Sequence, residues 1–302
     1  MPALSSRRVR LGLVNGDVPD DPALFTPWLI EGWQTRGVSC LAVAFSAAGA
    51  DRSPARMEQL RELLAAGDVA VSQFSSVNAN LVHPDRDVRS DAVDRVARVI
   101  PSAQALGARV IISGAGTCSP RWRTHFYDPH RGNYLPEAED RIVDSLSRIA
   151  ELIDPTDLVY AIECHQLGPM RSPEVIRRVL DRVDHPRVVA NFDPVNLIDA
   201  PHKAFLNEEA IPAMIDIVGN RYAPTCHIKD IVVLEELPFT SREAPPGRGL
   251  IDPRTVFAAA LRLPGDGDVD IIVEHLGPAE AEVAFRHVRD QALAMGLELV
   301  GA

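Results

Sequence analysis

The sequence predicts an α/β fold, specifically a (β/α)8 barrel that spans residues 1–302 as a single domain. Short apolar runs rich in strand-forming residues alternate eight times with segments of helical periodicity. A doubly wound sheet fits less well, because Gly12 to Gly16 lacks the GxGxxG spacing of its first turn. No break in composition and no low-complexity linker divides the chain, so one domain is expected.

The first half of the chain supplies four strand-then-helix units. The third helix has the clearest signal, since Val88, Ala92 and Val96 begin an apolar series spaced by three or four residues. Pro101 is expected to kink this helix and Gly107 to end it. The expected strands are 8–14, 40–45, 69–74 and 109–113, and the expected helices are 22–36, 54–67, 87–106 and 136–153.

The second half repeats the pattern and begins with the most informative unit, residues 158–196. Its strand 158–162 is followed by a helix that Ser172 caps and Pro173 opens, and by a second apolar strand, 188–192. This arrangement predicts a βαβ crossover between parallel strands. The remaining elements are helix 207–218, strand 224–228, a helix that begins at Asp252-Pro253, strand 270–273 and helix 279–297.

Charge and composition exclude several classes of partner. The net charge of −11 makes nucleic acid or an anionic membrane an unfavourable partner, because both are bound through excess positive charge. The N-terminus holds no apolar stretch long enough for a signal sequence or membrane span, so a cytoplasmic location is expected. Cys40, Cys118, Cys164 and Cys226 are scattered, which predicts buried packing residues rather than disulfides or a thiolate zinc site.

Four of the predicted strands end in a residue that binds metals well. Glu163, Asp193, His227 and Glu274 follow the fifth to eighth strands in succession. One acid at a strand end is more often a helix cap or an ion-pair member, but four in succession favour a site, since the carboxyl ends of barrel strands converge. Three carboxylates and one imidazole suit Mn²⁺ best, with Mg²⁺ or Co²⁺ as alternatives.

The chain resembles the xylose isomerase-like TIM barrels, a family that includes ketose 3-epimerases, hydroxypyruvate isomerase, inosose dehydratase and proteins called sugar phosphate isomerase/epimerase. The resemblance covers nearly the whole chain, and its motifs together are specific for the superfamily though not for one activity. They are Ala161-Ile162-Glu163-Cys164-His165, Asn191-Phe192-Asp193-Pro194-Val195-Asn196-Leu197, His227-Ile228-Lys229-Asp230, Pro246-Gly247-Arg248-Gly249-Leu250-Ile251-Asp252 and Ile272-Val273-Glu274.

The resemblance implies specific roles for the strand-end residues. The family's four metal ligands correspond to Glu163, Asp193, His227 and Glu274, and in the epimerases the two glutamates also move the proton on either face of the substrate. Physical chemistry agrees with this role. A metal that holds a ketone and its neighbouring hydroxyl stabilises the enediolate, and a nearby carboxylate can then act as the base.

Two positions depart from the ketose epimerases, which usually carry His three residues after the second ligand and Arg six residues after the metal-binding His. This chain has Asn196 and Val233 there. Asn196 can bind a sugar hydroxyl but cannot titrate, so His165 is a candidate catalytic group or a hydrogen-bonding support. Asn196 also separates the chain from the apurinic endonucleases of this fold, which assemble several zinc ions with extra His ligands.

Lys229 lies two residues after His227 and is one of only two lysines among 31 basic residues. We expect it to contact the substrate or a developing oxyanion. The alternative is an ion pair with Asp230 or with another neighbouring acid.

Two long loops, 114–135 and 231–251, are expected to close the site or to form an interface with another subunit. Trp122 and His125 in the first loop could stack on a sugar or hydrogen-bond to it, and Arg248 in the second could also bind substrate. A homo-oligomer or a partner subunit therefore remains open.

The leading functional prediction is a divalent-metal-dependent isomerase or epimerase that acts through an enediolate on a ketose or keto-sugar derivative. The first alternative is a lyase of the same fold, which dehydrates a keto-inositol or cleaves an oxidised glycoside by elimination. The second is a non-catalytic sugar-binding subunit. In each case the expected partner is a small-molecule sugar.

Overall fold

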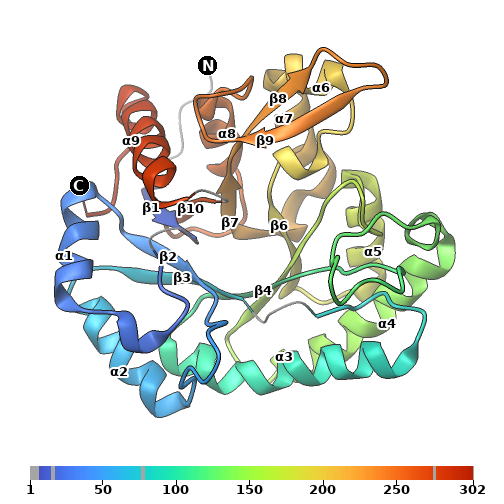
Figure 1. The fold of residues 1–302 in the computed structure, drawn as a ribbon, viewed down its shortest axis with the longest axis horizontal. Helices are drawn as coiled ribbons and strands as arrows, with labels where there is room; N and C mark the ends of the chain where they lie inside the picture. Colours follow the sequence, from blue (N-terminus) through green and yellow to red (C-terminus); the bar gives the residue numbers. More distant parts are fainter. Residues whose placement is uncertain (1–6, 15–17, 76–78, 275–276, 302) are drawn as a thin grey trace.

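Eight parallel strands close into a barrel surrounded by helices, which confirms the predicted (β/α)8 architecture (Figure 1). The computed structural model describes residues 7–14, 18–75, 79–274 and 277–301. Neighbouring strands follow the order β1-β10-β7-β6-β5-β4-β3-β2. Their bounds are β1 Val9–Leu13, β2 Cys40–Val43, β3 Ala70–Ser75, β4 Val110–Gly114, β5 Val159–Glu163, β6 Val188–Phe192, β7 Tyr222–Ile228 and β10 Val269–Val273.

The helices pack outside the barrel, and those that follow Ser53 and Ser172 begin as the sequence predicts. Thr26, Ser53 and Ser172 each accept a hydrogen bond from a first-turn amide, with proline at the start of the helix. The bounds are α1 Pro27–Arg36, α2 Pro54–Ala65, α3 Arg86–Leu106, α4 Pro136–Ile153, α5 Pro173–Val183, α6 Pro201–Phe205, α7 Asn207–Val218, α8 Pro253–Ala260 and α9 Pro278–Ala294.

The barrel strands are almost entirely buried, because side chains fill the interior and helices cover the outside. Registers are regular where strands pair without a bulge, as in β4 and β5, where Val110 pairs with Val159 and Gly114 with Glu163. This register brings the carboxyl ends of the two strands to the same level. Residues at these ends can therefore form one site.

Several elements differ from the expected boundaries. The predicted helix 22–36 is a short 3₁₀ turn, η1 (Pro22–Leu24), followed by α1, because Thr26 caps a new helix. The short helix α6 was not expected. Pro101 lies inside α3 without ending the helix, while Gly107 closes it in the left-handed conformation at φ 74°. Further 3₁₀ turns are η2 (Arg131–Tyr134), η3 (Val195–Leu197) and η4 (Gly219–Arg221).

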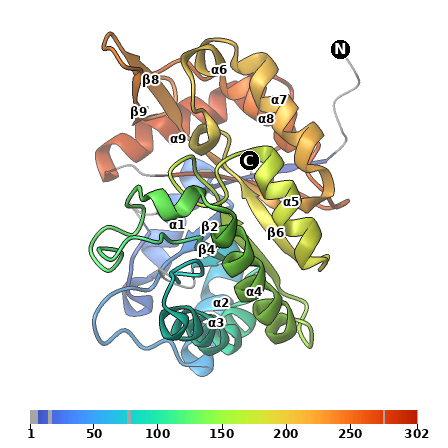
Figure 2. The ribbon, with the colours of Figure 1, turned by 90° about the vertical axis from the view of Figure 1, so that its right-hand side faces the viewer.

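The main correction concerns residues 231–251, expected as a loop. The segment forms most of an antiparallel hairpin of β8 (Asp230–Leu234) and β9 (Thr240–Ala244), which stands beside α6 at the carboxyl end of the barrel (Figure 2). Its first strand reads Ile231-Val232-Val233-Leu234, a β-branched run that favours an extended strand. The apolar run was therefore a strand signal.

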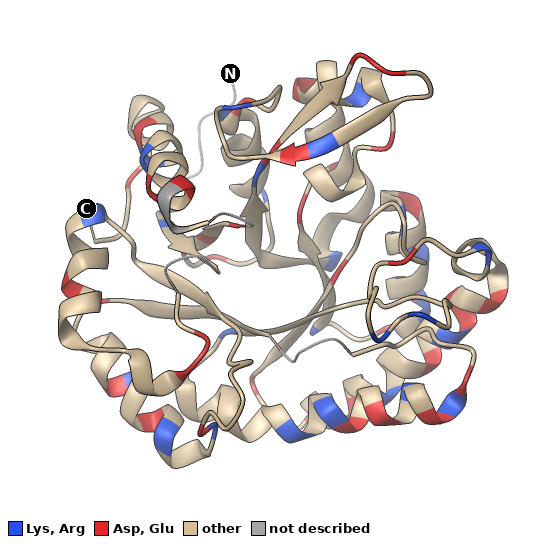
Figure 3. Cartoon of the chain, in the orientation of Figure 1, with Lys and Arg blue, Asp and Glu red and all other residues tan. Residues whose placement is uncertain are grey.

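The molecule's surface carries both signs of charge. Figure 3 shows acidic and basic residues interspersed along the outer helices. All four cysteines are buried and free, which confirms their packing role. Within the described residues, no helix combines the length and apolar character that crossing a membrane requires.

Candidate active site

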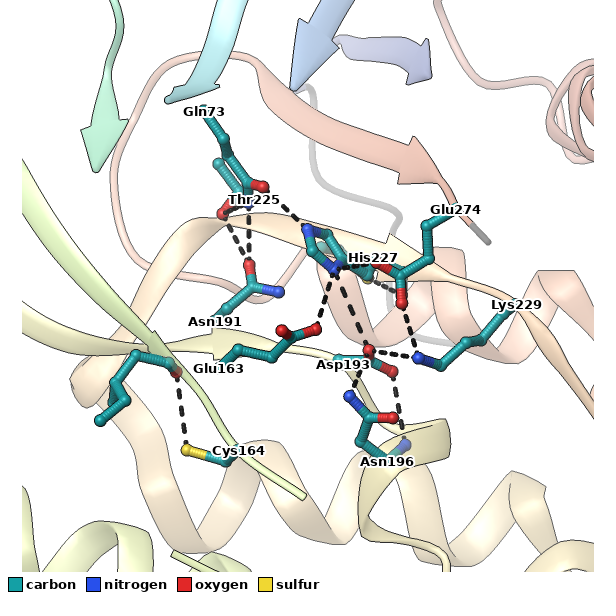
Figure 4. Close-up of polar contacts among 12 residues, drawn as sticks. Gln73, Glu163, Cys164, Asn191, Asp193, Asn196, Thr225, His227, Lys229 and Glu274 are labelled. Atoms are coloured by element: carbon teal, nitrogen blue, oxygen red, sulfur yellow. Dashed lines mark hydrogen bonds and ion pairs between the residues drawn. The ribbon is translucent and has the colours of Figure 1, made fainter. Parts of the chain in front are cut away.

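Glu163, Asp193, His227 and Glu274 converge at the carboxyl end of the barrel (Figure 4). Glu163 ends β5, Asp193 and Glu274 follow β6 and β10 directly, and His227 lies near the end of β7. One potential ligand atom from each residue lies within 4.8 Å of all the others, and three of the four residues are buried. Separate strand ends thus bring together one cluster of three carboxylates and an imidazole.

The imidazole of His227 faces the cluster with Nδ1. Its Nε2 lies 2.8 Å from Gln73 Oε1, an acceptor, so Nε2 carries the proton and donates it to Gln73. Nδ1 lies 2.7 Å from Glu274 Oε2 and 3.7 Å from Glu163 Oε1, yet this buried nitrogen makes no hydrogen bond of acceptable geometry. The neutral tautomer would aim its lone pair at the carboxylates, as a metal ligand does.

Gln73 is itself held by two polar side chains inside the barrel. Its Nε2 donates to Asn191 Oδ1 at 3.0 Å and to Thr225 Oγ1 at 2.9 Å, and Thr225 donates to Asn191 at 3.0 Å. These buried groups fix the amide, and the amide orients His227. Gln73 and Thr225 were not predicted from the sequence, although a polar side chain within a buried strand was the available signal.

Lys229 brings a buried ammonium into the cluster. Its Nζ lies 2.6 Å from Glu274 Oε1, 2.9 Å from Asp193 Oδ2 and 2.9 Å from Glu243 Oε1. Three carboxylates therefore compensate its positive charge, as a buried cation requires. The alternative of an ion pair with a neighbouring acid is thus present in this structure, but Asp230 is not the partner.

Asp230 instead fixes the base of the hairpin. Its carboxylate accepts backbone N–H groups from four residues at 2.7 to 3.1 Å. Each carboxylate oxygen accepts two of these hydrogen bonds, so Asp230 stabilises the backbone turn and does not pair with Lys229. The four donors are Ile231, Gly247, Gly249 and Ile251.

Burial and charge shift the titration of the cluster. Burial raises the pKa of Asp193 to about 7 despite the nearby Lys229 ammonium. Burial alone would lower the pKa of His227, but the carboxylates of Glu274 and Glu163 raise it to about 10. The cluster therefore holds protons at neutral pH that a cation would displace on binding.

A cavity of about 520 Å³ opens beside the cluster, and a smaller one of about 140 Å³ lies over the ends of β1 to β4. Tyr127 and Glu163 line both cavities. The larger cavity is lined by both apolar and polar side chains, as small-molecule sites commonly are. Its other lining residues are His165, Gln166, Leu167, Val195, Asn196, Ile231, Ser241, Arg242 and Glu243.

Tyr127 and Asn196 hydrogen-bond to Glu163 and Asp193, and His165 packs against Tyr127. The Tyr127 hydroxyl donates to Glu163 Oε2 at 3.2 Å, and its ring lies edge-on to His165 with centroids 4.5 Å apart. Asn196 Nδ2 donates to Asp193 Oδ2 at 2.7 Å. His165 Nε2 is buried without a partner, and burial lowers the pKa of His165 to about 4, so the ring is neutral at neutral pH.

Trp122, His125 and Arg248 do not line either cavity. The Trp122 side chain is only 8% exposed, with the Arg123 guanidinium 4.5 Å from its ring centroid. His125 and Arg248 are exposed, and His125 Nδ1 lies 2.9 Å from Thr124 Oγ1. Substrate contact by these three residues stays a prediction.

The residues present fit a hard divalent cation. Carboxylate oxygens and one imidazole nitrogen are ligands that Mg²⁺ and Mn²⁺ accept. The buried Nδ1 of His227, which has no hydrogen bond, points into the same space, and Gln73 holds the ring from the other side. Glu163, Asp193, His227 and Glu274 would hold such an ion.

Comparison with known proteins agrees with the fold. A family model described as xylose isomerase-like TIM barrel matches residues 34–291. No curated protein matches the sequence. A xylose isomerase-like TIM barrel protein from Mycobacterium smegmatis, solved in complex with magnesium, is 17% identical with a TM-score of 0.66, covering 96% of this chain and 98% of its own.

Two further solved structures illustrate how different the activities on this fold are. A 3-keto-D-glucoside 4-epimerase from E. coli is 15% identical with a TM-score of 0.65, covering 94% of this chain and 100% of its own. Endonuclease IV from Thermus thermophilus is 14% identical with a TM-score of 0.67, covering 94% of this chain and 99% of its own. At these identities the likeness shows the fold alone, so function must be argued from the site.

Proposed function

Because the chain belongs to the xylose isomerase-like TIM barrel family, we propose that it is a divalent-metal-dependent isomerase or epimerase of a ketose or keto-sugar derivative. The observation that carries the proposal is the convergence of Glu163, Asp193, His227 and Glu274 within 4.8 Å beside an open cavity. Mn²⁺ is the proposed ion, with Mg²⁺ or Co²⁺ as alternatives, because the donors are mostly hard oxygens.

A bound divalent cation would supply Lewis-acid polarisation of the substrate carbonyl and the adjacent hydroxyl, which makes the neighbouring C–H more acidic. Glu163 and Glu274 are the proposed bases. One carboxylate takes the proton from carbon to leave an enediolate, and the other returns a proton to the opposite face. Their separate supports, Tyr127 for Glu163 and Lys229 for Glu274, hold the two carboxylates in place for these roles.

Three further side chains have proposed roles beside the reacting carbon. Lys229 would stabilise negative charge that develops on substrate oxygen, since its ammonium lies within the cluster. Asn196 and His165 line the larger cavity and would bind sugar hydroxyls. The neutral His165 ring, with its unpaired Nε2, can donate or accept such a bond.

A lyase that cleaves an oxidised glycoside by elimination is the second candidate. The observation that favours it is the lining of the larger cavity, which includes the apolar side chains of Leu167, Val195 and Ile231 as well as Glu163. Such a lining suits an aglycone attached to the reacting sugar. Proton abstraction is common to both reactions, but only the lyase expels a group from the adjacent carbon.

We further propose that the protein works in the cytoplasm on a small-molecule sugar and that it binds neither nucleic acid nor a membrane. The net charge of −11 supports this choice. Within the described residues there is one group of potential metal ligands.

Turnover in D₂O tests the proposal. Mn²⁺-loaded protein is incubated with a panel of ketoses and 3-keto-glycosides, and deuterium at the carbon next to the carbonyl is followed by NMR. An isomerase or epimerase conserves substrate mass apart from the isotope, while a lyase releases water or an aglycone. Exchange that requires the metal supports the proposal, and a chain that binds the sugars without exchange would be a non-catalytic sugar-binding subunit.

Variants of the two glutamates locate the bases. Glu163→Gln and Glu274→Gln keep one oxygen for coordination but cannot accept a proton, so each should lower the rate by roughly 10²–10⁴. Metal content is measured alongside each rate. If both variants keep their metal and the full rate, another residue moves the proton, and Lys229 and His165 are then the first to examine.

A further inference from the structure

The β8–β9 hairpin extends one acidic side chain to the centre of the site. Glu243 lies in β9 opposite Ile231 of β8, and its Oε1 is 2.9 Å from Lys229 Nζ. Directly paired residues of an antiparallel ladder share one face, so Ile231 and Glu243 lie on the same side of the hairpin, and both line the larger cavity. The hairpin therefore forms a wall of the site and reaches its buried cation.

Lys229 connects this wall to the proposed metal ligands. Its side chain is buried, and its Nζ contacts Asp193 Oδ2 and Glu274 Oε1 as well as Glu243. Asp193 and Glu274 belong to the cluster that faces His227, whereas Glu243 lies outside that cluster and on a different element. The ammonium therefore forms ion pairs both with two of the proposed metal ligands and with the hairpin.

We propose that Glu243 is a positioning residue of the metal centre, which holds the Lys229 ammonium and so limits how strongly that ammonium competes with a divalent cation for Asp193 and Glu274. The inference rests on the proposed function in one respect, namely that the cluster binds a divalent cation. It adds a residue that neither the motifs nor the four-ligand cluster includes.

Charge neutralisation gives the direction of the effect. Without the Glu243 charge, Lys229 would keep Asp193 and Glu274 as its ion-pair partners among the described residues and would pair with them more strongly. The site would also lose one negative charge that attracts a cation. Both changes weaken cation binding, and the effect is moderate because the Glu243 side chain is 46% exposed and partly screened by solvent.

The same ion pair couples the hairpin to the metal site. A cation that draws Asp193 and Glu274 towards itself leaves Lys229 more dependent on Glu243. Because coupling between two binding events is reciprocal, cation binding should then strengthen the docking of β9 onto the barrel. The hairpin should become more protected from solvent when the metal is present.

Calorimetric titration with Mn²⁺ tests the inference directly. Glu243→Gln should weaken Mn²⁺ binding by roughly 3- to 10-fold, since it removes one partly screened charge and its contact. Glu236→Gln makes the same charge change at an exposed position of the same hairpin and should leave the affinity unchanged. Glu243→Asp keeps the charge but shortens the side chain, so it should also bind Mn²⁺ more weakly than the unchanged protein.

Hydrogen exchange of residues 230–244 supplies a second measurement that needs no substrate. Mn²⁺ should slow exchange of the hairpin amides in the unchanged protein and in Glu236→Gln, but much less in Glu243→Gln. A thermal unfolding scan shows whether each variant is folded. Glu243 is half-exposed on a hairpin, so the Gln and Asp variants should remain folded.

The possible results distinguish a failure of this inference from a failure of the proposed function. If no protein of the series binds Mn²⁺, Mg²⁺ or Co²⁺, the proposed function itself fails. If the unchanged protein binds Mn²⁺ and Glu243→Gln binds it equally well, the inference is overturned while the proposed function stands. Equal affinity in Glu243→Asp and the unchanged protein would also overturn it, since general charge and not the contact would then be responsible.

Discussion

The orientation of His227 depends on one amide inside the barrel. Gln73→Leu removes the acceptor of Nε2–H and also the amide donor that Asn191 and Thr225 share. We expect Mn²⁺ affinity to fall by about 10- to 100-fold, the usual cost of losing a group that supports a metal-binding histidine. Calorimetry measures the change, and Gln104→Leu on the exposed face of α3 is the control. Unchanged affinity in Gln73→Leu would mean that His227 is held by other contacts.

Cation binding should also depend on pH in a defined direction. The pKa of His227 is raised to about 10 and that of Asp193 to about 7. Above pH 7 a cation displaces mainly the His227 proton, so affinity should fall by about tenfold per pH unit as the pH decreases. Below pH 7 Asp193 also takes up a proton, so the fall should steepen to about 100-fold per unit. Titrations between pH 6 and 8.5 check this, and a flat affinity would contradict these protonation states.

Trp122 distinguishes two interpretations of the first loop. The sequence predicts a sugar contact, but the side chain is only 8% exposed and lies outside both cavities. Its burial predicts that Trp122→Ala lowers the free energy of unfolding by about 3 kcal/mol with KM unchanged. Trp28→Ala is the control, since Trp28 is 80% exposed on α1 and should change stability by about 0.5 kcal/mol at most. A raised KM with normal stability would support the sugar contact.

At the scale of elements, the hairpin depends on the turn that Asp230 organises. Gly249 donates its N–H to Asp230 Oδ2 at 2.7 Å, and an added Cβ would lie 2.5 Å from Asp230 Oδ1 and closer still to the Ile231 carbonyl oxygen. Gly249→Ala should therefore push the base of the hairpin apart and cost about 1–3 kcal/mol of stability.

Hydrogen exchange should reveal where the Gly249→Ala variant loosens. Faster exchange is expected in β8 and β9, with the barrel strands unchanged. Gly267→Ala is the control, because a Cβ there meets nothing within 4 Å. Uniformly faster exchange throughout the chain would instead indicate that the turn contributes to the stability of the whole barrel.

The hairpin was also the element that sequence reasoning missed. Its Gly and Pro content suggested a loop, although the run Ile231-Val232-Val233-Leu234 favours an extended strand. Pairing between β8 and β9 depends on a register that only the folded chain specifies. For the same reason no local pattern distinguished Glu243 from the other acids of this segment.

At the scale of the whole molecule, strand order determined which site residues could be predicted. The alternation of strands and helices predicted the closed barrel, and the strand ends predicted Glu163, Asp193, His227 and Glu274, because barrel closure brings successive strand ends together. Gln73 was missed since it reaches His227 across the barrel interior, at a separation of 154 residues. Contacts across the barrel depend on closure, strand tilt and side-chain volume, which no single segment encodes.

If these four strand-end residues form one divalent-cation site, anomalous X-ray diffraction from a crystal grown with Mn²⁺ should locate the ion among them. We expect one strong anomalous peak within bonding distance of Glu163, Asp193, Glu274 and His227 Nδ1, with Lys229 Nζ still paired to Glu243. A peak elsewhere, or no peak in a crystal whose Lys229 ammonium fills the space between the carboxylates, would contradict it.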